Sequence, residues 1–500
     1  MAKNKRIFFK GVFFSYLYIA IYLITGVLVT PMLLNYFKAD YFALLMLVYT
    51  IITYLNNIKF GLPESLAVLL AKNKEQHTNV FLVKRTLLIV TIITILAFVL
   101  FYILGLFITD WRILLGDVYS LDKYNVVYIF YVLIIFALLR IPLDISLFVF
   151  IGFHEVYLEK IYKIINLLLN FLLIVFVINS SQSILFFVLW AGILDFLVSF
   201  ISFIHMILKY KILQKNNLIQ CVDSTELLKN GFLFVQLSMT QTIVWGAGIL
   251  IVSHLLLLED VTVYSLSMKI YVYIYYAYTI INTVIAPLYG KYFAYKSWDD
   301  IWRIFSIIVL LLPFFGGFIW ISTIYFMSDI IFLWTGSKEF FIGLPFVFFM
   351  GIYFYFTGYV NSYITLLYSI GEVKSIILIR WKEVMVNLMF SSLLVYFIGL
   401  LGIAIGISSA VIVSVWYLPK YIKLKTDNNI FLDFTIQKKH FILILLPSLI
   451  IALMVSFMMN SLSYKFIIFI FMISLYVVFT WKIIQLKYKI EIKKILRLRG

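Results

Sequence analysis

Residues 86–108 read TLLIVTIITILAFVLFYILGLFI, an apolar run without a charged side chain. Lys84 and Arg85 flank it on one side, and Asp110 on the other. A helix needs about 20 apolar residues to cross the hydrocarbon core of a bilayer. The run lacks the strict alternation of a membrane β-strand, and backbone polar groups in lipid must be bonded within their own helix. This stretch therefore predicts a membrane-spanning α-helix.

Similar runs recur along the whole chain of 500 residues, which is 64% hydrophobic and 13% charged. Soluble domains contain about 25% charged residues, and the mean hydropathy here is +1.07. A soluble fold is thereby excluded, and we predict an all-α polytopic membrane protein with fourteen transmembrane helices. The predicted spans are 12–34, 41–70, 86–108, 124–151, 161–178, 184–208, 231–257, 262–290, 302–327, 341–368, 376–398, 400–419, 440–459 and 465–481.

The first run follows a basic segment, as the apolar core of a signal peptide does. Residues 12–34 are too long for such a core, and no small-residue cleavage site follows them. We therefore expect a first transmembrane helix that is retained.

Lysine and arginine test this number of spans, because cytoplasmic connections of membrane proteins are enriched in both. With the N-terminus placed in the cytoplasm, most of the 40 basic residues fall in alternate, cytoplasmic connections, and the pattern never inverts. Both termini are therefore predicted to be cytoplasmic, and the net charge of +17 needs no nucleic acid. The outer connections contain Lys38, Arg112, Lys123, Lys338 and Lys465. Lys59, Arg140 and Lys269 fall inside spans, whereas basic residues near the cytoplasmic ends of other spans, such as Lys160, Lys163 and Arg380, count with the adjacent connections.

The connections between spans leave little room for a catalytic domain. The longest outer connection is about 109–123, and no nucleotide-binding loop or zinc-binding motif occurs. Cys221 is the single cysteine, so a disulfide within the chain is impossible. We therefore expect a transporter rather than an enzyme, without a bound cofactor but with possible coupling to H⁺ or Na⁺.

The longest cytoplasmic connections divide the chain into lobes. We predict an N-terminal lobe of six helices at 1–208, a cytoplasmic linker at 209–230, and a C-terminal lobe of six helices at 231–420. Two further helices and a basic tail follow at 421–500. Transporters commonly contain such repeated halves, with the substrate path between them.

The opening segment, residues 15–71, contains TPMLL at 30–34 and KADYF at 38–42. KFGL at 59–62 then lies in the long second span. These features resemble the opening of the Wzx-type flippases of polysaccharide repeat units. That family belongs to the multidrug/oligosaccharidyl-lipid/polysaccharide (MOP) exporter superfamily. Its members often have an acidic residue where this chain has Lys59, which is a departure from the pattern.

Two later stretches extend the resemblance over the first twelve spans. Residues 264–287 have Lys269 near their start and Pro287 at their end. YSIGEVK at 368–374 is followed, one span later, by GLLGIAIG at 399–406. Each motif is degenerate, so the resemblance depends on their order and spacing together.

The resemblance implies two six-helix bundles in a V-shaped arrangement similar to that of MATE transporters, and transport by alternating access. It implies a bacterial inner-membrane protein whose cargo is an oligosaccharide repeat unit linked to undecaprenyl diphosphate. The flippase would move this cargo to the outer leaflet for the synthesis of O-antigen and lipopolysaccharide, capsule or exopolysaccharide. Polymerase and chain-length proteins are the implied partners, besides membrane lipid.

A charge inside a transmembrane helix costs at least about 2.5 kcal/mol on insertion scales, so each one needs a reason. Arg140 and Asp144 share one helix face at i, i+4. They either neutralise each other or form a diphosphate site in which Asp144 orients the guanidinium. Lys59 and Glu64 either reach the cytoplasmic interface or form a cationic mouth for the diphosphate, with a bend at Pro63.

Lys269 has no acidic residue three or four positions away, so it either extends its ammonium to the outer surface or faces an anionic cargo. Tyr273 and Tyr276 fall on the Lys269 face, where they either pack against lipid or bind sugar rings. Asp195 has no basic residue one turn away on its own helix. It either ties helices together as a protonated donor or takes part in ion coupling, for which Glu64 and Asp144 are further candidates.

Two other function classes stay open. One is a polytopic polysaccharide polymerase or glycosyltransferase, although Asp110, Asp117 and Asp122 in the outer connection are too far apart for a metal-binding pair. The other is an ion-coupled drug or cation antiporter of the same superfamily, which would use acidic rather than basic residues in its lumen.

Overall fold

The computed structural model describes residues 2–73, 75–107, 115–116, 123–212 and 225–425, together with 470, 473–474, 476–478 and 482. All regular elements within these ranges are helical, and ten candidate spans among them are long and apolar enough to cross a membrane. The predicted all-helical, multi-pass architecture is confirmed. The predicted span 440–459 and most of 465–481 lie outside the described residues.

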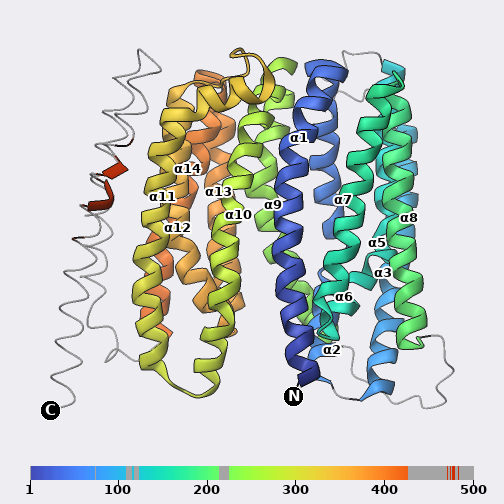
Figure 1. Ribbon diagram of the computed structural model, residues 1–500, viewed down its shortest axis with the longest axis vertical. Helices are drawn as coiled ribbons and strands as arrows, with labels where there is room; N and C mark the ends of the chain where they lie inside the picture. Colours follow the sequence, from blue (N-terminus) through green and yellow to red (C-terminus); the bar gives the residue numbers. More distant parts are fainter. Residues whose placement is uncertain are drawn as a thin grey trace. The chain divides into compact units, whose positions relative to one another are not determined.

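Internal contacts divide the chain into two units, Met1–Ser265 and Leu266–Gly500, each of which is described by itself. The boundary between them lies within α10 (Leu258–Ala294). The helices of the first unit are drawn from blue to green in Figure 1. They are α1 (Ala2–Leu55), η1 (Asn56–Lys59), α2 (Leu62–Lys72), α3 (Gln76–Phe107), α5 (Lys123–Leu143), α6 (Ile145–Gly152), α7 (Val156–Asn179), α8 (Ile184–Tyr210) and α9 (Thr225–Leu255).

Within the described residues, the second unit contains most of α10 and the four helices α11 to α14 (Figure 1). These are α11 (Trp298–Thr335), α12 (Leu344–Ser369), α13 (Val373–Ile398) and α14 (Leu400–Lys425). The lobe boundaries predicted from connection lengths, 1–208 and 231–420, stay a prediction.

The first predicted span and the first part of the second lie in one element, α1, which has a break at Lys38. Lys38 has φ 66 and ψ 168, which no α-helix contains. A non-glycine residue in this region ends the helical hydrogen bonding locally. Lys38 therefore separates two helical segments of α1, and their connection is a single residue rather than a loop.

The second span is interrupted again, at residues 56–61. A short 3₁₀ helix, η1, follows α1, and Phe60 and Gly61 both take left-handed conformations with φ 51 and 64. The expected bend at Pro63 is wrong in position, because Pro63 lies in the first turn of α2. There its missing N–H has no helical partner to lose, so proline is well tolerated.

Close packing against α9 explains the glycine at this break. A Cβ atom on Gly61 would lie 2.4 Å from the carbonyl oxygen of Gly231 and 2.6 Å from the backbone nitrogen of Val235. No side chain fits there, so glycine provides both the left-handed backbone and the space. The start of α2 thus packs directly against the backbone of α9.

The predicted span 124–151 is also divided, into α5 and α6. Pro142 removes one backbone donor, and Asp144 stands between the two helices. The short helices α2 and α6 pack against each other. A Cβ atom on Gly152 would lie 2.7 Å from the Cβ atom of Leu70. Two interrupted spans therefore have their shorter halves in contact.

In the second unit, glycines allow close contact between α13 and α14. A Cβ atom on Gly402 would meet backbone atoms of Leu394 and Val395 at 2.5 Å. One on Gly406 would lie 2.1 Å from the Ser391 hydroxyl oxygen. Gly402 and Gly406 therefore lie where the two helices pack most closely.

Candidate functional site

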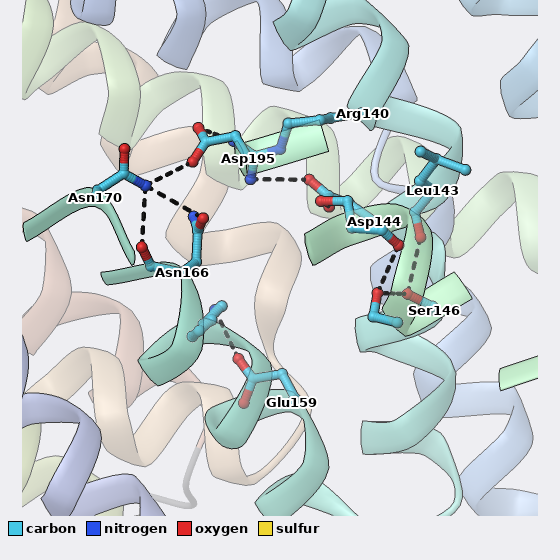
Figure 2. Close-up of polar contacts among 11 residues, drawn as sticks. Arg140, Leu143, Asp144, Ser146, Glu159, Asn166, Asn170 and Asp195 are labelled. Carbon is cyan, nitrogen blue, oxygen red and sulfur yellow. Dashed lines mark hydrogen bonds and ion pairs between the residues drawn. The ribbon is translucent and has the colours of Figure 1, made fainter. Parts of the chain in front are cut away.

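Arg140 lies near the end of α5, just before the break at Asp144, and bridges two carboxylates (Figure 2). Its Nη1 atom donates to Oδ2 of Asp195 on α8 at 2.6 Å. Its Nη2 atom lies 3.6 Å from Oδ2 of Asp144. The α5–α8 packing thus brings together three of the residues singled out from the sequence.

Hydrogen bonds from neighbouring helices hold both carboxylates. Asp195 Oδ1 accepts a hydrogen bond from the Asn170 side chain on α7 at 2.9 Å. Asn170 also donates to the backbone oxygen of Asn166 at 3.0 Å. The Ser199 hydroxyl donates to Oδ1 of Asp144 at 2.6 Å. We call Arg140, Asp144, Asn166, Asn170, Asp195 and Ser199 the Arg140 network.

The Arg140 network contains one formal positive and two formal negative charges. Its three charged side chains are 25–29% exposed, so they are neither dry nor fully solvated. The Nε–H of Arg140 is buried and has no hydrogen-bond partner among the described residues. Both a phosphate oxygen and a water molecule are suitable acceptors for that N–H.

The pairing answers part of what the sequence left open. Arg140 and Asp144 do interact along one chain segment, but the shorter contact of Arg140 is with Asp195. The sequence predicts that Asp195 has no basic neighbour on its own helix. Its basic partner in the structure is Arg140, which lies on α5. The roles of these residues in cargo binding and ion coupling stay predictions.

We expect Ser199→Ala to lower the free energy of unfolding by about 1.5 kcal/mol, because a hydrogen bond to a charged group is lost. Thermal unfolding of the purified protein measures this change. Ser322→Ala is the control, because the Ser322 hydroxyl donates to the Phe318 carbonyl of its own helix. Equal stability loss in the two variants would contradict a specific role of the Ser199 hydroxyl.

Lys59 and Glu64 form an ion pair across the break between η1 and α2. Lys59 Nζ lies 3.3 Å from Glu64 Oε1, and both side chains are partly exposed. Lys59 Nζ also lies 4.6 Å from the centre of the Phe148 ring on α6. In a continuous helix, two residues five positions apart point to different faces. The break between η1 and α2 therefore brings this cation and this anion together.

Lys269, Tyr273 and Tyr276 all lie on α10, within the second unit. The helix is continuous here, so the predicted shared face at i, i+4 and i+7 is compatible with its geometry. All three residues are half-buried. The Tyr273 ring contacts Trp334 of α11 edge-on, with 6.4 Å between ring centres.

Two charge clusters were missed in the sequence. On α13, Arg380 forms an ion pair with Glu383, whose side chain is 2% exposed. On α7, Glu159 is almost fully buried and contacts both Lys160 and Lys163. Their basic residues were assigned to cytoplasmic connections. The i, i+3 and i, i+4 spacings to an acidic residue were the signal that could have identified them.

No protein-family model matches the chain, and no curated protein matches it in sequence. Its fold is similar to those of solved membrane transporters, among them a lipid II flippase and MATE transporters.

Three such structures define the likeness. The lipid II flippase MurJ in an inward closed conformation matches with a TM-score of 0.69 and 14% identity, over 96% of this chain and 99% of that chain. An inward-facing multidrug resistance MATE family transporter of the MOP superfamily matches with a TM-score of 0.60 and 13% identity, over 81% of this chain and 95% of that chain. A mutant of the Vibrio cholerae MATE transporter VcmN matches with a TM-score of 0.61 and 13% identity, over 85% of this chain and 99% of that chain.

The predicted fold class is thereby confirmed. At these identities the likeness concerns the fold, so the Wzx-type family and its cargo belong to the proposal below.

Proposed function

We propose that this protein is a flippase for oligosaccharide repeat units linked to undecaprenyl diphosphate. In this proposal it turns the cargo from the cytoplasmic to the outer leaflet of a bacterial inner membrane, by alternating access, for polysaccharide synthesis. The observation that carries the proposal is the match to a lipid II flippase over 96% of this chain. The MATE structures cover less of it, 81% and 85%.

The charges inside the spans fit an anionic headgroup. Moving a polar headgroup through hydrocarbon without partners is prohibitively costly, so a flippase must offer polar groups along its path. We assign Lys59, Arg140 and Lys269 to the diphosphate, and the buried Nε–H of Arg140 is a donor that a phosphate oxygen can satisfy.

The remaining parts of the proposal follow from the sequence. Tyr273 and Tyr276 are assigned to sugar rings. Asp195, with Glu64 and Asp144, is assigned to coupling with H⁺ or Na⁺. Both termini are placed in the cytoplasm, with lobes at 1–208 and 231–420.

Lys269→Ala should reduce polymer export about tenfold in a strain that lacks its own flippase, because one charge-assisted contact to the cargo is lost. Lys269→Arg keeps the positive charge and should restore most of the export. Polymer on the cell surface and lipid-linked single units in the inner leaflet are measured at matched protein levels. Undiminished export by Lys269→Ala would remove Lys269 from the cargo path.

An ion-coupled drug or cation antiporter is the second candidate, because MATE transporters share this fold. Such a transporter needs carboxylates for its cationic cargo. Here Glu64 is paired with Lys59, and Asp144 and Asp195 are paired with Arg140. Efflux of ethidium from cells, abolished by Asp195→Asn, would favour this function over the flippase.

A further inference from the structure

The first turns of α7 contain a buried carboxylate between two lysines. Glu159 is 2% exposed. Lys163 Nζ lies 2.6 Å from Glu159 Oε1, and Lys160 Nζ lies 3.0 Å from Glu159 Oε2. The lysines themselves stay accessible, with 42% of the Lys163 side chain and 21% of the Lys160 side chain exposed. One buried anion therefore positions two reachable cations.

Helix α1 covers this cluster with aromatic and basic side chains. The Tyr18 ring lies 5.2 Å from Lys160 Nζ and 5.8 Å from Lys163 Nζ. Nearer the start of α1, Lys10 Nζ lies 5.6 Å from the Tyr157 ring. We call Tyr18, Glu159, Lys160 and Lys163 the α1–α7 cluster. It contains two cations and one anion, so it is positive even with its internal ion pairs formed.

The ion pairs of Glu159 with Lys160 and Lys163 are not needed to set the orientation of α7 in the membrane. The positive-inside bias requires only that lysines lie near a cytoplasmic helix end, where they stay in water. Here both ammonium groups are bound to a carboxylate from which water is excluded. Because the two ammonium groups share that carboxylate, they lie close enough together for one diphosphate to contact both. The N-terminus of α7 adds a favourable helix dipole for an anion.

We propose that the α1–α7 cluster is a docking site for the diphosphate of a membrane-borne polyprenyl lipid, occupied before the headgroup reaches Arg140. This inference rests on the proposed flippase function. Glu159 keeps the two lysines in place while the site is empty, and the diphosphate competes with it for both ammonium groups.

The position of the α1–α7 cluster suits such a first step. Lys163 lies three positions, about one helical turn, before Asn166 of the Arg140 network on α7. Figure 2 shows Glu159 in the same region as Arg140, Asp144 and Asn166. A diphosphate released from Lys163 would therefore next meet the guanidinium of Arg140, which binds phosphate in a bidentate manner.

The test is binding of farnesyl diphosphate and of inorganic pyrophosphate to the full-length protein in phosphatidylcholine nanodiscs. Glu159→Gln keeps the side-chain shape but removes the competing charge, so both probes should bind about tenfold more tightly. Replacing both lysines, in Lys160→Gln/Lys163→Gln, should weaken binding of both probes at least about tenfold, and Lys160→Arg/Lys163→Arg should restore it. Weaker binding by Glu159→Gln, with unchanged binding by the double Gln variant, would overturn the proposal.

The lipid source is tested by repeating the titrations in nanodiscs that contain phosphatidylglycerol. If that lipid removes the differences between variants, the cluster binds ordinary phospholipid headgroups, and the proposed diphosphate site is wrong. Unchanged differences support a diphosphate site. Thermal unfolding of each variant separates a folding defect from a binding defect, because the double Arg variant keeps both charges.

Flipping of a fluorescent polyprenyl-diphosphate saccharide by wild-type proteoliposomes is measured in parallel. Flipping without the expected binding pattern would overturn only the docking site. The binding pattern without flipping would overturn only the proposed function.

Discussion

Arg140→Ala should abolish transport and lower the free energy of unfolding by about 3 kcal/mol, the lower end of the range for breaking a buried ion pair. The lower end applies because Arg140 and Asp195 keep 29% and 26% of their side chains exposed. Without the guanidinium, Asp144 at the α5–α6 junction and Asp195 on α8 become two carboxylates with no cation between them. Thermal unfolding in detergent and export in a flippase-deficient strain measure the two effects.

A double variant separates stability from transport. Arg140→Gln/Asp195→Asn replaces the ion pair by two neutral amides, which can still bond to each other and to Asn170. We expect most of the stability to return, since replacing both partners of a buried pair is far less costly than removing one. Transport should stay absent, because the variant lacks both the guanidinium assigned to the diphosphate and the carboxylate assigned to ion coupling. A double variant that transports normally would show that Arg140 serves the fold alone.

Gly61→Ala should destabilise the protein by about 2–5 kcal/mol, from two causes. A non-glycine residue in the left-handed region costs about 1–2 kcal/mol. The new Cβ atom would also lie 2.4 Å from the Gly231 carbonyl oxygen, and relieving such overpacking costs about 1–3 kcal/mol more. Because the atoms it meets belong to the α9 backbone, α2 must shift as a whole, and Glu64 shifts with it. Unfolding temperature and export are the measurements.

Gly336→Ala is the matched control for Gly61→Ala. Gly336 has φ +81, at the end of α11, and a Cβ atom there would meet nothing within 4 Å. It should therefore show only the conformational cost, about 1–2 kcal/mol. If both variants lose the same stability, the contact between α2 and α9 is looser than described, and the break at residues 56–61 is not held by α9.

Hydropathy was sufficient to predict the helices but not their interruptions. The apolar run 86–108 lies within α3 to its last described residue, Phe107, because any such run in lipid must bond its own backbone. The break at Phe60 and Gly61 depends instead on the packing of α2 against α9, whereas the division at Asp144 follows Pro142. Pro63 misled the prediction, because a proline marks equally the start of a helix and a bend within one.

For the candidate site, the sequence identified the charged residues but only one of their pairings. Arg140 and Asp144 are four positions apart, so their contact follows from helix geometry. Asp195 is 55 positions from Arg140, and only the packing of α5 on α8 brings the two together. For Lys160 and Lys163, the sequence predicted only that they lie in a cytoplasmic connection. In the structure, both contact the buried Glu159.

The sequence by itself determined that the chain is a helical membrane protein, and which residues place charge inside its spans. Both follow from the one-dimensional cost of moving groups from water into lipid. Tertiary structure alone decided where the second span breaks, which carboxylate neutralises which cation, and which buried donor has no partner among the described residues. Those outcomes depend on distances of a few ångström between separate helices, and a linear pattern of hydropathy and charge contains no such distances.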